Sequence, residues 1–70
     1  MRRWRVRFVP KDRARFSWPA FETVVEHDHY QQAVTLAGLE LVEGRDGEAG
    51  NRLCWDLTLV QLVEDDGADT

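Results

Sequence analysis

The side chains best suited to bind an anion lie in the first fifteen residues of the chain. Seven of the nine Lys and Arg residues fall there against one carboxylate, Asp12, so this segment carries about +6. Two Arg and twelve carboxylates give the rest about −10. On an extended segment, alternate side chains stand about 7 Å apart on one face, near the spacing of successive phosphates in a nucleic-acid strand. The cations that would bind nucleic acid are Arg3, Arg5, Arg7, Lys11, Arg13 and Arg15.

The same arginines have an internal alternative, which is pairing with carboxylates of the chain itself. Glu22 and Glu26 on a second strand and Asp56 on a third are predicted to share the arginine face. Each cross-strand pair of opposite charge contributes about 0.2 to 1 kcal/mol. RNA-binding sheets also expose aromatic side chains on the binding face, whereas Trp4 and Phe8 fall on the opposite face here. Internal pairing is therefore favoured over nucleic-acid binding.

Other residues that carry chemistry form no recognised catalytic or metal-binding pattern. Residues 27–29 read His-Asp-His, but two histidines with Cys54 are too few and too irregularly spaced for a zinc site. Cys54 has no activating neighbour in sequence, which predicts an unreactive thiol. Residues 44–47 contain two glycines but lack the Lys-Ser/Thr ending of a phosphate-binding loop. We expect no enzymatic activity, no cofactor and no bound metal.

Length and composition predict one small globular domain. The chain has 70 residues, of which 43% are hydrophobic, with three Trp, three Phe and one Tyr, which is too apolar for a disordered chain. A single cysteine excludes an internal disulfide and fits a reducing compartment. No long apolar run follows the basic N terminus or occurs elsewhere, which predicts neither a secretory signal nor a membrane span. We expect a cytoplasmic protein without membrane contact.

The element that must position the arginines is a strand over residues 2–9. Its apolar side chains Trp4, Val6 and Phe8 point one way and its arginines point the other. This period of two indicates a strand with one buried face. Pro10 has no N–H to donate, so it is expected to end the strand.

Two further strands are predicted. Residues 21–27 contain a β-branched run after an extended Trp-Pro entry, and a helix beginning at Ser17 is the alternative. The apolar residues that alternate along the third strand are Leu53, Trp55, Leu57 and Leu59. Val60 and Leu62 are out of phase with them, so either a bulge shifts the register or both faces of the strand end are covered.

An amphipathic helix is predicted between the second and third strands. Asp28 and Gln31 form an Asp-x-x-Gln capping box at its start. The side chains expected to face the sheet are Tyr30, Ala33, Val34, Ala37 and Leu41. Gly44 is its natural end. Gly38 offers an earlier end, in which case residues 39–43 would form a short strand paired with the next one.

This order of elements predicts an α+β fold of the type β-β-α-β. A right-handed crossover through the helix, with the third strand beside the first, makes every adjacent pair antiparallel. The expected architecture is a three-stranded antiparallel sheet of order 2-1-3 with one helix packed on one face. We expect a single domain over residues 1–63 and a disordered acidic tail over residues 64–70.

Apolar side chains outside this core predict a surface that binds a protein or a second copy of the chain. The residues assigned to this surface are Leu36, Leu39, Val42, Val60, Leu62, Phe16 and Trp18. Two internal alternatives remain open. A helix that ends at Gly38 would bury Leu39, and the two loop aromatics could fold back on the core.

The segment Val-Glu-His-Asp-His-Tyr-Gln-Gln-Ala-Val-Thr-Leu-Ala, from Val25 to Ala37, follows a basic Trp-x-Val-x-Phe strand. Over residues 2–43 the chain resembles small uncharacterised strand-strand-helix-strand proteins of bacteriophages and their hosts. His27 stands where that pattern has Ala. The resemblance implies a viral or prophage accessory role in the host cytoplasm, exerted by binding a host or phage protein, and it carries over no functional residue.

These observations lead to two hypotheses of different classes. The first is a non-enzymatic protein-interaction module that acts as a homo-oligomer, an adaptor or an inhibitor of a larger protein. The second is a nucleic-acid-binding protein that uses the arginine stripe and the basic loop behind it.

Overall fold

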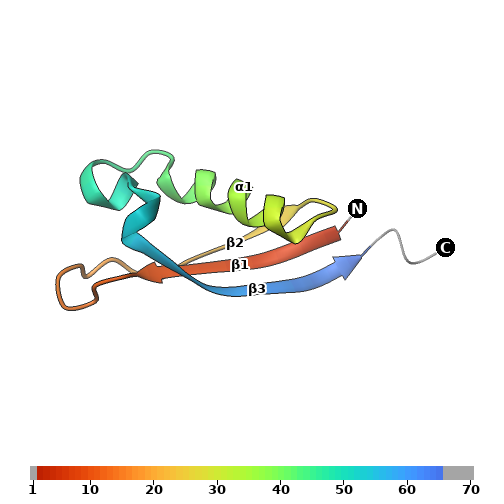
Figure 1. Cartoon of the computed structure of the whole chain (residues 1–70), viewed down its shortest axis with the longest axis horizontal. Coiled ribbons are helices and arrows are strands. Elements are labelled where there is room, and N and C mark those ends of the chain that lie inside the picture. Colours follow the sequence, from red (N-terminus) through yellow and green to blue (C-terminus); the bar gives the residue numbers. More distant parts are fainter. Residues whose placement is uncertain (1, 66–70) are drawn as a thin grey trace.

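The computed structural model describes residues 2–65. The strands are β1 (Arg2–Pro10), β2 (Phe21–Glu26) and β3 (Trp55–Asp65), and the helix is α1 (Tyr30–Val42). Two short 3-10 turns, η1 (Gly47–Gly50) and η2 (Arg52–Cys54), lead from the helix into β3 (Figure 1). The chain therefore follows the predicted order of strand, strand, helix and strand.

β1 is the central strand of an antiparallel sheet with the order β2-β1-β3, which confirms the predicted topology and the α+β class. Trp4 lies opposite Val25 in β2, and Arg7 lies opposite Glu22. Because side chains alternate along β1, the sheet has one apolar face and one face that carries arginines. We call the second one the arginine face.

α1 covers the apolar face of the sheet above β1 and β2 (Figure 1). The buried core consists of Val6, Phe8, Val25, Ala33, Ala37, Leu41 and Trp55. The small side chains of Ala33 and Ala37 let the helix backbone lie close to the sheet. Tyr30, the first residue of the helix, is about half exposed, and its ring centroid lies 6.2 Å from that of Trp4 on the sheet.

The start of the helix differs from the prediction. Its N-cap is His29, and no side chain caps it, so the predicted capping box of Asp28 and Gln31 is wrong. The backbone N–H of His29 donates to Nδ1 of His27 at 3.2 Å. The imidazole of His27 therefore accepts a backbone N–H at the start of the helix that would otherwise have no partner. The N-cap itself lies one residue later than the sequence pattern indicated.

The helix continues through Gly38 and ends at Val42. Gly44 follows with a φ of 75°, the left-handed conformation expected of a glycine after a helix. Residues 39–43 do not form a short strand, so that alternative is wrong. Leu41 is fully buried on the helix face that packs on the sheet. The free energy gained by burying the Leu41 side chain exceeds the cost of about 1 kcal/mol for placing a glycine inside a helix.

A bulge in β3 changes the face on which its side chains lie. Leu57 and Leu59 lie opposite neighbouring residues of β1, so Thr58 between them is an extra residue. This confirms the bulge as the reason for the break in phase. Leu59 consequently lies opposite Arg7 on the arginine face, whereas strict alternation had placed it wrongly with the core residues. Val60 returns to the apolar face.

β3 also begins and ends later than predicted. Leu53 belongs to η2 and is exposed, so the strand starts at Trp55. A second register shift makes Val63 another extra residue. The strand runs to Asp65, two residues into the predicted tail, because it stays paired with the first residues of β1. The rest of that tail, residues 66–70, lies outside the described part of the chain.

Gly50, at the end of η1, has no room for a side chain. A Cβ there would collide with the backbone carbonyl oxygen of Arg45. Because a backbone atom cannot rotate away, we expect Gly50→Ala to lower the free energy of unfolding by about 1 to 3 kcal/mol, as in other overpacked sites. Urea unfolding measures this loss.

Gly38→Ala is the matched control. Its Cβ would meet only the flexible side chain of Arg52, at 3.3 Å, and Ala favours the helix by about 1 kcal/mol over Gly. We expect a much smaller change for Gly38→Ala than for Gly50→Ala. Equal effects of the two variants would contradict the collision at Gly50.

Candidate functional site

Two arginines of the predicted stripe lie beside glutamates of β2. Nε of Arg3 is 3.5 Å from Oε1 of Glu26, and Nε of Arg5 is 3.8 Å from Oε2 of Glu22. Asp56 of β3 lies on the same face. The sequence thus predicted correctly which carboxylates share the arginine face. All four paired side chains are about half exposed, so each pair contributes at most about 1 kcal/mol.

The loop between β1 and β2 is held by a stack of side chains that reaches into the core. Trp18 lies between Phe16, with ring centroids 4.1 Å apart, and Trp55, with centroids 5.2 Å apart. The guanidinium of Arg15 lies over the Phe16 ring, 4.9 Å from its centroid. Nη2 of Arg15 is also 2.8 Å from Oε1 of Glu48 in η1. We call these residues the loop stack.

The loop stack decides what the aromatic side chains of this loop can do. Both ring faces of Trp18 are covered by other aromatic rings, and the faces of Phe16 are covered by Trp18 and Arg15. A nucleic-acid base needs an open ring face on which to stack. The loop therefore offers cations but no stacking platform, and its aromatic residues serve to join the loop to η1 and the core.

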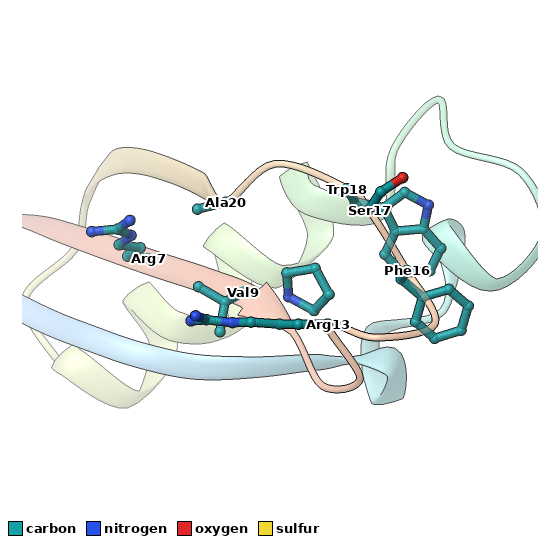
Figure 2. A pocket seen from close by; sticks show the side chains of 8 residues that line it. Arg7, Val9, Arg13, Phe16, Ser17, Trp18 and Ala20 are labelled. Atoms are coloured by element: carbon teal, nitrogen blue, oxygen red, sulfur yellow. The ribbon is translucent and has the colours of Figure 1, made fainter.

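A hollow of about 360 Å³ lies where the loop crosses the arginine face near the end of β1. Figure 2 shows the guanidinium groups of Arg7 and Arg13 on one side of it and Phe16 and Trp18 on the other. Within residues 2–65, neither of these two arginines nor Lys11 forms an ion pair. Their charges are thus available to a carboxylate or a phosphate from outside.

The partner-binding residues predicted on the helix are only partly gathered in one place. Leu39 and Val42 line a second hollow, of about 300 Å³, together with Gly38 and Arg52. Leu39 is exposed and Val42 is half-buried. Leu36 is exposed but does not line this hollow. The hollow is shallow apolar surface between α1 and η2.

The partner-binding residues predicted on β3 belong to a larger apolar surface. Val60 is half-buried, and the exposed fractions of Leu57, Leu62 and Val63 are 41%, 45% and 39%. Sequence reasoning missed Leu57 and Val63. Leu57 lies on the predicted apolar face, opposite Phe8, but it is exposed because α1 packs above β1 and β2. Val63 is the extra residue of the second bulge, which the spacing of apolar residues does not locate.

The outer edge of β3 carries this apolar surface. β3 is the last strand of the sheet, and within residues 2–65 no strand pairs with its outer edge. Bulges and charged residues, with which proteins commonly block an exposed edge, lie toward both ends of this strand, whereas residues 59–62 between the two bulges carry no charge and no Pro. An edge of this kind offers backbone N–H and C=O groups together with apolar side chains to another strand.

The residues considered for a metal site lie at opposite ends of the sheet. The N–H of His27 donates to the carbonyl of Arg2 at the start of β1, whereas the carbonyl of Cys54 accepts from Lys11 just after its end. His27 and His29 have ring centroids 6.1 Å apart. Among residues 2–65 no group of three or more His, Cys, Asp or Glu side chains is placed to hold a metal ion.

Comparisons with known proteins add no relative. No family model, no curated protein and no solved structure matches the chain. In the described residues, no helix has the length and apolar character needed to span a membrane.

Proposed function

We propose that this chain is a small non-enzymatic protein-interaction module that binds through the outer edge of β3. The observation that carries the proposal is an eleven-residue strand whose outer edge pairs with no strand of residues 2–65 and whose exposed side chains include Leu57, Leu62 and Val63. A strand of a partner added to this edge would form main-chain hydrogen bonds and cover these side chains. The chain would act in the cytoplasm as an oligomer, an adaptor or an inhibitor of a larger protein, which fits the accessory role that the resemblance to phage proteins implies.

The competing hypothesis of nucleic-acid binding has less support. Arg3, Arg5 and Arg15 lie beside carboxylates of the chain itself, and the loop stack covers its aromatic rings. Arg7 and Arg13 are cations without such partners in the described part of the chain. Two such guanidiniums can bind one anionic group, but they do not track a nucleic-acid backbone.

The test is capture of a binding partner by the tagged chain in the native host, compared among variants. We expect a double Leu62→Lys and Val63→Lys variant to lose the partner, because two cations would remain unpaired in the contact. Leu53→Lys is the matched control, since Leu53 is exposed but outside β3. It should keep the partner.

Three results would contradict this proposal. Capture that survives in the β3 variant but fails in a Leu39→Lys variant would move the surface to the helix. Salt-sensitive retention on DNA or RNA that Arg7→Gln and Arg13→Gln abolish would favour the nucleic-acid hypothesis. Absence of both a partner and self-association in the wild-type chain would exclude an interaction module.

A further inference from the structure

We propose that the strand that adds to β3 is β3 of a second copy of the chain, in an antiparallel pair about a two-fold axis at Gln61. This inference rests on the proposed function, because it assigns the partner of the same edge. The product would be a six-stranded sheet with one helix from each copy on the same face.

The sequence at the centre of β3 is self-complementary. Residues 59–63 read Leu-Val-Gln-Leu-Val, which is an apolar palindrome in residue class around Gln61. In an antiparallel pair centred there, Val60 of one copy lies opposite Leu62 of the other, and the contact occurs twice. Val60 and Leu62 both lie on the face of the sheet that the helix covers, so they can contact each other across the two copies. A two-fold interface requires a self-complementary sequence of this kind, whereas the binding of an unrelated strand does not require it.

The register of β3 with β1 supports the same centre. Residues 59–62 are paired with β1 without interruption, between the register shifts at Thr58 and Val63. Gln61 lies in this regular stretch and is exposed, and its Oε1 accepts a hydrogen bond from Arg5 at 3.5 Å. The inner part of the palindrome, from Val60 to Leu62, thus lies in the part of the edge whose pairing with β1 is regular, whereas Val63 is a bulge residue.

The test is the mass of the full chain in solution, measured by light scattering after gel filtration and by analytical ultracentrifugation over a range of concentrations. We expect the wild-type chain to reach twice the monomer mass of 8.1 kDa. Gln61→Glu and Gln61→Lys should each weaken the dimer about tenfold or more, because like charges then face each other across the axis. An equimolar mixture of the two variants should recover the wild-type affinity as a heterodimer.

Both variants change an exposed side chain, so circular dichroism is expected to show an unchanged monomer fold. Leu53→Lys is the control and should leave the dimer intact.

The outcomes separate this inference from the proposed function. A monomeric wild-type chain whose partner capture still depends on Leu62 would overturn the second copy and retain the β3 edge as a site for a foreign strand. A dimer whose affinity is unchanged by both Gln61 variants but is lost in Leu39→Lys would overturn both proposals, the β3 edge as the binding surface and a second copy as its partner. Failure of the Glu and Lys variants to associate in the mixture would overturn the two-fold axis at Gln61.

Discussion

Trp55→Ala is expected to lower the free energy of unfolding by about a third or more. Trp55 is only 1% exposed and is the largest side chain of the core. It stacks against Trp18 at 5.2 Å, and its Nε1 donates to the carbonyl of Ala49 at 3.1 Å. Removing a buried Trp costs about 3 to 5 kcal/mol. A domain of 70 residues has a total stability of about 4 to 10 kcal/mol, so this one substitution removes a third or more of it.

Circular dichroism and urea unfolding measure this loss. Trp55→Phe is an informative second variant, since it keeps a ring against Trp18 and removes the hydrogen bond to Ala49; we expect an intermediate loss. Leu53→Ala is the control, because Leu53 lies two residues away and is exposed. A Trp55→Ala variant as stable as Leu53→Ala would mean that the junction of loop, η1 and core is not formed.

Leu41→Ala should produce the second large loss, about 2 to 5 kcal/mol. Its side chain is 0% exposed and packs the last turns of α1 against the sheet. The helix has no side-chain cap at its start and contains Gly38, so its stability comes from this packed face and not from local propensity. The expected result is a lower urea midpoint with the same two-state transition.

Leu39→Ala is the matched control on the same helix. Leu39 is 60% exposed, so we expect its loss to stay within about 0.5 kcal/mol. The comparison also separates helix from strand over residues 39–43. Side chains two apart in a strand lie on the same face, whereas two apart in a helix they lie on different faces. Similar losses for Leu39→Ala and Leu41→Ala would contradict the helix.

The topology of the sheet follows from local patterns in this chain. Trp4, Val6 and Phe8 alternate with arginines over one uninterrupted strand, and this alone separates the core face from the arginine face. Short connections and the right-handed crossover then leave one arrangement with β1 in the centre. The positions of Glu22 and Glu26 beside the arginines follow from the same alternation.

The candidate binding surface was predictable only in part. Val60 and Leu62 could be identified as unusual because they break the phase of β3. Leu57 keeps the predicted face, and its exposure follows from where α1 packs on the sheet, above β1 and β2. Val63 could not be identified, because it is the extra residue of a bulge. A bulge inserts one residue into the pairing with β1, and nothing in the spacing of apolar residues states which residue that is.

Residue order alone established the α+β class, the central basic strand and the separation of charge along the chain, since periodicity and charge are properties of neighbours in sequence. Contacts between distant segments decided the rest. Burial of Leu41 carried the helix past Gly38, and Arg15 and Trp55 closed the ring faces of Phe16 and Trp18. Pairing with β1 left the outer edge of β3 without a partner strand in residues 2–65. Such outcomes depend on which segments meet in space, and packing free energy, not local propensity, selects them.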